Sequence, residues 1–94
     1  MKTSELQGAA LDWAVTQCEQ FVEDVFEPSE NWADGGPIIE REKIGLKCHS
    51  DGTWEASHPE CLYWKRGETP LVAAMRCYVA SKLGDEIEIP EELR

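Results

Sequence analysis

The segment 69–84 constrains the fold most, because it predicts a helix that is apolar or small nearly all round. Thr69 is a favourable N-cap, Pro70 suits the first helical position, where a missing N–H costs nothing, and Gly84 marks the end. Leu, Val, Met and Tyr side chains form a broad apolar arc, and Ala, Cys and Ser make the opposite side small. A helix with almost no charged face is buried on two sides. We expect one side to cover a sheet and the small side to approach another helix or a second subunit.

The middle of the chain predicts a hairpin of antiparallel strands. Apolar and polar residues alternate over 44–49, and Asp51–Gly52 follows as a hairpin-turn signal. A turn of three residues, rather than two, sets Cys48 opposite Trp54 and keeps the apolar side chains on one face. We therefore expect a type I turn with Gly52 in a bulge.

Weaker signals complete the predicted fold. A helix is expected over 4–25, opened by a capping box at Ser4, although its Val- and Phe-rich second half also suits an extended chain. A short strand is expected at 61–65, and 86–89 alternates as an edge strand with its glutamates facing water. The prediction is a single α+β domain over 1–94, with two helices packed on a small, mainly antiparallel β-sheet.

The net charge of −10 is unevenly distributed. Residues 1–36 hold eight acids and one base, 85–94 hold five acids and one base, and 37–84 hold six acids and seven bases. Because an acidic chain repels nucleic-acid backbones, no direct nucleic-acid binding is expected. The acids either keep a small protein soluble or form a face that meets a basic partner or mimics nucleic acid. The balanced middle leaves room for a local basic pocket that binds a small anion.

The hydropathy pattern gives no reason to expect a membrane protein. No apolar run approaches the roughly 20 residues needed to cross a bilayer. The first residues, Met1 to Glu5, lack the apolar core of a signal peptide. We therefore expect a cytoplasmic protein without a cofactor, whose four cysteines are reduced thiols.

The segment Trp32–Glu42 combines an aromatic residue, two adjacent glycines, a proline, an apolar pair and alternating charges. Gly35 and Gly36 allow positive φ, and Pro37 fixes the direction in which the chain leaves. This pattern predicts a shaped loop that leads into an extended run at 38–39. Loops of this kind often present backbone N–H groups to a ligand or to a packed neighbour.

Arg76 lies on the helix that is predicted to be buried, and a buried guanidinium needs a carboxylate or an anionic ligand. Either it bridges to Glu40, Glu42 or Asp85 and ties the helix to the loop, or it helps to hold a phosphate or carboxylate. In the second case a tryptophan stacks on the ligand and the loop N–H groups bind the anion. The candidate ligand-binding residues are Trp32, Gly35, Gly36, Arg41, Trp54 and Arg76.

A zinc site is a further alternative, because Cys48, His49, His58 and Cys61 lie within fourteen residues. His58 and Cys61 have acceptable ligand spacing. Cys48 and His49, however, are neighbours on a predicted strand and point to opposite faces. The pair of cysteines two residues apart that usually anchors structural zinc is absent from the sequence. A core Cys48 with two surface histidines is the competing interpretation, and we favour it.

No catalytic residues are predicted. Cys18 and Cys77 lie among apolar residues on predicted helices, where cysteine acts as a small hydrophobic residue. Cys61 near His58 could form a thiolate pair, but no motif supplies an acid that orients the histidine. The many carboxylates follow from the acidic composition and do not indicate a hydrolase.

Three blocks of the chain resemble a known family: residues 2–15, 32–42 and 69–86. They are similar to the NinX-like family of small proteins from tailed bacteriophages and prophages. The resemblance implies a phage or prophage origin, action inside a bacterium and no catalytic residues. The segment 47–66, with its cysteines, histidines and Tyr-Trp pair, matches no motif of that family.

Two binding functions are compatible with these features, and a purely structural role is a third possibility, because a buried arginine that ties the helix to the loop would explain the same residues. The first is an accessory protein that inhibits a host defence or regulatory factor, in which the acidic first helix and tail cover a basic surface of that protein. The second is a protein that sequesters a small nucleotide-like anion between the Gly-Gly-Pro loop and the C-terminal helix. A homodimer is compatible with either function, because a short chain has a marginal core and the 70–83 helix has a small face.

Overall fold

The computed structural model describes residues 1–19 and 25–93 and has an α+β fold. Within these residues, three α-helices accompany a three-stranded antiparallel sheet of order β1-β2-β3, so the predicted class is confirmed with one helix more than expected. The elements in chain order are η1 (Thr3–Glu5), α1 (Gly8–Cys18), α2 (Trp32–Glu42), β1 (Gly45–Cys48), β2 (Trp54–His58), β3 (Cys61–Gly67), α3 (Pro70–Leu83) and η2 (Glu91–Leu93), where η denotes a 3-10 helix. None of the described helices is both long and apolar enough to span a bilayer.

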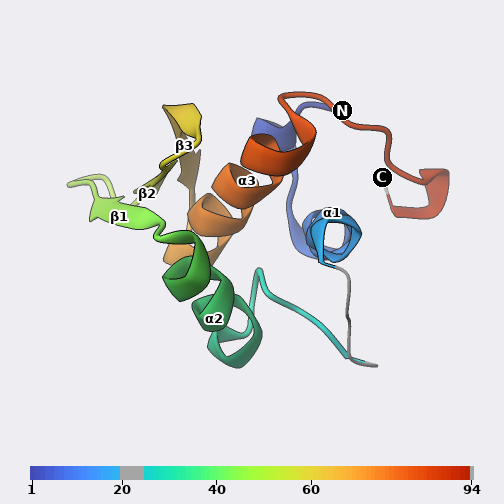
Figure 1. Ribbon diagram of the computed structural model, residues 1–94, viewed down its shortest axis with the longest axis horizontal. Coiled ribbons are helices and arrows are strands. Elements are labelled where there is room, and N and C mark those ends of the chain that lie inside the picture. The colour runs from blue at the N-terminus through green and yellow to red at the C-terminus, as the bar shows by residue number, and fades with distance from the viewer. Residues whose placement is uncertain (20–24, 94) are drawn as a thin grey trace.

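Helix α3 forms the centre of the molecule, with the sheet on one side, α1 on another and α2 below (Figure 1). Its predicted ends are confirmed: Thr69 Oγ1 accepts a hydrogen bond from the Val72 N–H at 3.1 Å, and Gly84 follows the helix with φ 87°. The expected burial on two sides is also confirmed. Small residues of α3 such as Ala73 and Ala74 are fully buried by elements of the same chain.

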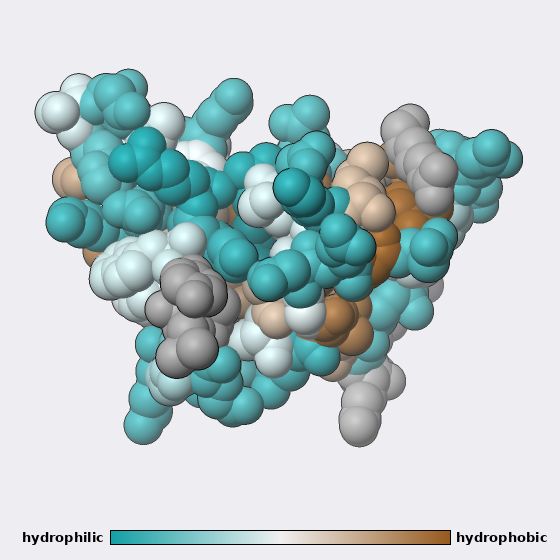
Figure 2. Space-filling view, turned by 90° about the horizontal axis from the view of Figure 1, so that it is seen from above, coloured by the Kyte–Doolittle hydropathy of each residue, from teal (hydrophilic) through white to brown (hydrophobic). Residues whose placement is uncertain are grey.

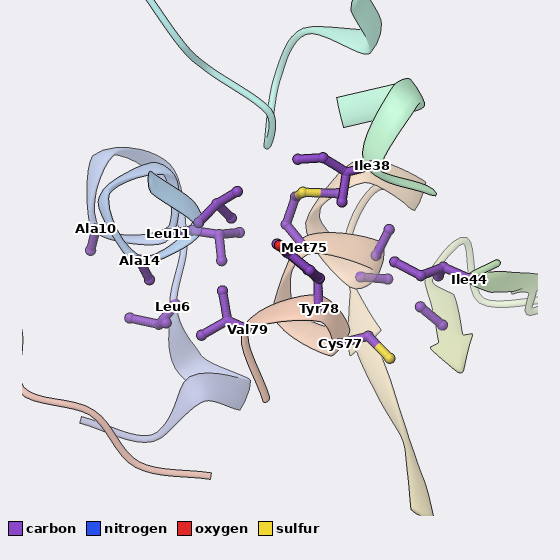
Figure 3. Packing of buried hydrophobic residues seen from close by; sticks show 14 of the residues in the cluster. Leu6, Ala10, Leu11, Ala14, Ile38, Ile44, Met75, Cys77, Tyr78 and Val79 are labelled. Carbon is purple, nitrogen blue, oxygen red and sulfur yellow. The ribbon is translucent and has the colours of Figure 1, made fainter. Parts of the chain in front are cut away.

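The core forms where α3 meets the other elements. Met75 and Val79 of α3 lie toward Leu11 of α1 and Ile38 of α2, and Cys77 points toward the sheet side (Figure 3). All five residues are buried, and burying one such aliphatic side chain stabilises the fold by about 1.5–3 kcal/mol. Cys77 thus occupies the core position that the sequence predicted.

The hairpin register agrees with the prediction. Cys48 pairs with Trp54 and Leu46 with Ala56, as expected. The His49 N–H then donates to the Thr53 carbonyl at 2.8 Å, which leaves the three residues 50–52 as the turn. Gly52 takes φ 91°, a conformation that glycine adopts without strain, and its N–H donates to the His49 carbonyl at 3.0 Å. The strand predicted at 61–65 is also present and extends as β3 to Gly67.

The loop predicted at Gly35–Pro37 is wrong, because the segment forms helix α2. Asn31 caps this helix by accepting the Ala33 N–H at 2.9 Å, and Ile38 is buried in the core instead of lying in a strand. At Gly35 the backbone packs tightly: a Cβ there would lie 2.5 Å from the Pro28 carbonyl oxygen and 2.6 Å from Leu71 Cδ2. Gly35 therefore serves close packing against these two neighbours, not a turn with positive φ.

The first predicted helix is also wrong at both ends. Thr3–Glu5 form a 3-10 turn, the chain is extended at Leu6, and α1 begins only at Gly8. The Ser4 capping box therefore does not form, and Leu6 is fully buried in this extended link. The helix ends at Cys18, before the Val- and Phe-rich part of the predicted segment, of which residues 20–24 lie outside the described residues.

The strand predicted at 86–89 is wrong as well. In the described part of the chain, this segment makes one isolated antiparallel bridge, between Glu86 and Lys2. Ile89 is buried and Ile87 packs against the core, so the apolar alternation reflects core contacts instead of sheet pairing. The Ile87 N–H donates to the Met1 carbonyl at 3.0 Å, which holds the two terminal segments side by side.

Candidate binding surface

Arg41, near the end of α2, forms the main polar link between the helices. Its two terminal nitrogens donate to the two carboxylate oxygens of Glu19 at 3.0 and 2.9 Å, and its Nε donates to Glu42 at 2.9 Å. The Tyr78 hydroxyl donates to the same Glu19 carboxylate at 2.6 Å, and the guanidinium lies over the Tyr78 ring. Arg41 thus ties α2 to α3 and to the end of α1, and both neighbouring carboxylates are already engaged.

These contacts control the ionisation of both glutamates. Burial alone would raise the pKa of Glu19, but hydrogen bonds from Arg41 and Tyr78 outweigh it, so the pKa lies below its ordinary value. The hydrogen bond from His58, together with Arg41, lowers the pKa of Glu42. Both groups are therefore held as carboxylates within the fold.

His58 is a buried structural residue and not a surface histidine as predicted. Its Nδ1 accepts the Glu60 N–H at 2.9 Å, so its Nε2 carries the proton and donates to Glu42 Oε1 at 2.9 Å. Both ring nitrogens are occupied, and the ring offers no lone pair to a metal.

The remaining residues of the zinc hypothesis do not converge either. Cys48 is exposed instead of buried in the core, and the His49 ring contacts Glu55. Among the residues that the structure describes, no three His, Cys, Asp or Glu side chains are placed to share a metal ion. The Cys61 side chain lies outside that description.

Arg76 does not pair with Glu40, Glu42 or Asp85, which corrects the prediction. Its Nε donates to the Leu6 carbonyl at 2.6 Å and its Nη1 to the Arg66 carbonyl at 2.7 Å. Its partial burial beside these neutral acceptors lowers its pKa. The guanidinium therefore joins the link before α1 to β3 and α3 through the backbone.

Arg41 and Arg76 do not form a shared anion pocket. Arg41 contacts Tyr78, which is two positions from Arg76 along α3, and helical residues two apart point to different sides. Trp54 lies on the sheet, half-buried against the core. Trp32, at the start of α2, is 53% exposed. Its ring lies beside Gly36, because the Trp32 Cε3 atom would be 3.8 Å from a Cβ placed at that glycine. Of the predicted pocket residues, the structure thus brings together only those that are neighbours on α2.

The structure instead forms a groove that the sequence did not predict. It encloses about 470 Å³ between α1, the segment before α2 and the C-terminal end. Apolar side chains, a threonine and three carboxylates line it: Ala9, Asp12, Trp13, Thr16, Phe26, Glu27, Glu30 and Leu93. Trp13 packs against the core, as predicted, and also lines the groove. Hydrophobic side chains are exposed among hydrophilic ones over the half of the molecule that holds α1 and the C-terminal segment (Figure 2).

The charges around this groove are unbalanced. Glu27 and Glu30 line it, and Glu91 and Glu92 precede the lining residue Leu93 in the chain. All four are exposed, and none of them forms an ion pair with a base in 1–19 or 25–93. Burial raises the pKa of Asp12, whose carboxylate accepts the Ser29 N–H at 2.9 Å. The arrangement therefore suits a partner that carries both apolar and positively charged groups.

A protein-family model described as "Bacteriophage P22, NinX" matches residues 20–82, which is more than half of the chain. No curated protein sequence matches the chain. The matched residues contain α2, the sheet and all of α3 except its last residue, Leu83. Helix α1 and η2, which contribute one wall and one end of the groove, lie outside the match.

Proposed function

Because the chain belongs to the Bacteriophage P22 NinX family, we propose that it is a non-enzymatic phage or prophage accessory protein that binds and inhibits a host protein. It acts in the cytoplasm of the bacterial host and covers a basic surface of a defence or regulatory factor. The partner inserts apolar side chains between α1 and the C-terminal segment and sets lysines or arginines against the carboxylates around them.

The observation that carries this proposal is the groove of about 470 Å³, which combines an apolar lining with carboxylates. The Trp13 and Phe26 rings are only partly buried, so they can bury more area against a partner. Glu27 and Glu30 lack basic partners in the described residues, so a cation of the partner does not have to displace an internal ion pair. Apolar burial then supplies affinity, and charge complementarity supplies specificity and a fast association rate.

The described polar groups favour binding over catalysis. The Glu19 carboxylate and the Tyr78 hydroxyl are engaged with each other and with Arg41, and His58 has both ring nitrogens occupied. Burial raises the pKa of the Cys18 thiol to about 11, which keeps it protonated and weakly nucleophilic at neutral pH. These contacts support the proposal of a binding protein, because the Glu19, Tyr78 and His58 side chains already make contacts within the fold.

The experiment compares two variants with the same charge change. The groove variant carries Glu27→Gln, Glu91→Gln and Glu92→Gln, and the control carries Glu40→Gln, Glu60→Gln and Glu68→Gln, all at exposed acids. Tagged wild type and variants are expressed in the host, captured at low ionic strength and released by a salt gradient. We expect wild type and control to retain a host protein with a basic surface, and the groove variant to lose it.

The salt dependence gives a second criterion. Raising the salt toward 1 M shortens the Debye length to about 3 Å, so an interaction guided by exposed charges should weaken steeply. The proposal fails if no host protein distinguishes the groove variant from the control, or if the distinguishing partner stays bound at high salt.

A further inference from the structure

Helix α3 packs on one face of the three-stranded sheet, and α1 lies beyond α3 (Figure 1). Leu46 and Ala56, a cross-strand pair, lie on this covered face and contact the core. Because side chains alternate along a strand, the residues next to them belong to the opposite face, which is called the open sheet face below. It consists of Gly45, Lys47, Glu55, Ser57, Trp64 and Arg66.

The open sheet face presents a large aromatic ring and a flat region. On β3, Trp64 and Arg66 flank Lys65, which pairs with a residue of the covered face, and Trp64 is 48% exposed. Gly45 pairs with Ser57, and a Cβ at Gly45 would lie 2.9 Å from Ser57 Oγ, so position 45 has no room for a larger residue. The tryptophan can bury more area against a partner, and the flat region can receive a side chain from it.

The charges of this face are mixed and cancel one another. Lys47, Glu55 and Arg66 lie side by side across the three strands. Asp51, in the hairpin turn, extends this group, because its Oδ2 lies 3.8 Å from Arg66 Nη1. Lys47 forms no ion pair within 1–19 and 25–93. The two bases balance the two acids, so the rest of the chain carries the whole net charge of −10.

This charge distribution decides which partner the open sheet face suits. The rest of the chain repels nucleic acids and acidic proteins, and a basic protein is attracted to the acidic groove more than to a neutral face. Two copies of the chain meet the least like-charge repulsion at this face, and each copy brings charges of both signs to it. We propose that the chain forms a homodimer in which the two open sheet faces pack against each other.

The pattern of the face is self-complementary about a two-fold axis that runs across the strands. The row of Lys47, Glu55 and Arg66 lies two residues, about 6.6 Å, along the strands from the level of Gly45. An axis between these two levels places each charged row over the flat and aromatic level of the other copy. Trp64 then stacks on the guanidinium of Arg66 of the other copy, and Lys47 lies over the small Gly45 there.

The dimer leaves the rest of the molecule free. The small side of α3, which the sequence suggested as a subunit contact, is buried within the same chain at Ala73 and Ala74. Helix α1 and the C-terminal segment lie on the side of α3 away from the sheet, so the groove of each copy stays open (Figure 1). The homodimer is therefore separate from the host-protein surface proposed above and does not depend on it.

The test is sedimentation equilibrium of the full chain from about 10 μM to about 1 mM, because a face of three short strands suits a weak dimer. We expect the average mass to rise toward that of two chains. Trp64→Ala is expected to weaken the association at least about tenfold, whereas Trp32→Ala, which removes a tryptophan of similar exposure from α2, leaves it unchanged. A monomer throughout this range, or equal effects of the two substitutions, overturns the proposal.

Two further measurements keep the proposal testable if Trp64→Ala disturbs the fold. Lys47→Glu changes an exposed residue and makes the face acidic, so it is also expected to weaken the dimer. Amide NMR signals that shift when the wild type is diluted are expected in β1–β3 and not in α1. Unchanged association in Lys47→Glu, or dilution shifts confined to α1 and the C-terminal segment, contradicts the proposal.

Discussion

At the scale of single residues, Arg41 and Arg76 show how a chemically correct expectation can be assigned the wrong partner. The sequence indicated that a partly buried guanidinium on the C-terminal helix needs compensation, and Arg76 is compensated. Its acceptors are backbone carbonyls at positions 6 and 66, however, and every residue carries a carbonyl. The sequence pattern therefore could not distinguish these carbonyls from the carboxylates that it proposed as partners. Arg41, in contrast, does bind the carboxylate of Glu42, its neighbour in sequence.

The Tyr78 hydroxyl should contribute measurably to stability. Tyr78→Phe removes its hydrogen bond to the ionised Glu19, and hydrogen bonds to charged groups contribute about 1.5–3 kcal/mol. We expect a loss of that size in the free energy of unfolding, measured by urea denaturation. Arg66→Gln is the comparison, because the Arg66 side chain is exposed and its ion pairs are long, at 3.8 and 4.0 Å, so that they should contribute less than about 1 kcal/mol. Equal losses for the two variants would contradict this assignment.

Stability should also fall in acid. The folded pKa values of Glu19 and Glu42 lie below the ordinary value of 4.5, so both groups stabilise the fold above that pH. The stabilisation is lost as the pH falls from about 5 through the depressed folded pKa values. Asp12, whose pKa is raised by burial, contributes in the opposite direction. Denaturation measured between pH 7 and pH 3 should therefore show that the free energy of unfolding falls less steeply in Glu19→Gln than in the wild type. An equal slope for the two proteins would refute this prediction.

At the scale of elements, local signals predicted those parts whose ends are fixed by neighbouring residues. The cap at Thr69 and the turn at 50–52 depend on short-range geometry, and the structure confirms both. Helix α2 was missed because glycine and proline have low intrinsic helix propensity. Contacts from distant parts of the chain override that propensity: Gly35 fits between Pro28 and Leu71, and Ile38 enters the core.

The two adjacent glycines of α2 should respond differently to alanine. In Gly35→Ala the new Cβ would clash with the Pro28 carbonyl oxygen and Leu71 Cδ2, so we expect a loss of about 1–3 kcal/mol in the free energy of unfolding. Gly36→Ala meets only an ordinary contact at 3.8 Å. Alanine at this position gains helix propensity, but a residue that precedes a proline is sterically disfavoured in a helix. These two effects oppose each other, so the free energy of unfolding should change by no more than about 1 kcal/mol. Thermal denaturation of both variants checks that Gly35→Ala loses more stability than Gly36→Ala. A larger loss of stability in Gly36→Ala would show that tight packing is not why a glycine is needed at position 35.

At the scale of the whole molecule, the uneven charge was visible in the sequence but its placement in space was not. The two acidic ends of the chain meet: the Met1 amino group donates to the Ile87 carbonyl at 2.9 Å, and the Thr3 N–H donates to the Asp85 carbonyl at 2.8 Å. These contacts span more than 80 positions and have no local signal. They place the C-terminal segment beside α1 and so create the groove that carries the proposed function.

The most direct test of this account is hydrogen–deuterium exchange of the chain, alone and bound to the host protein that it retains at low salt. The account predicts slower exchange on binding in peptides that cover α1 (Gly8–Cys18) and the C-terminal residues Glu91–Leu93, with little change in β1–β3. Protection confined to the strands, with α1 and the C-terminal segment unchanged, would contradict it.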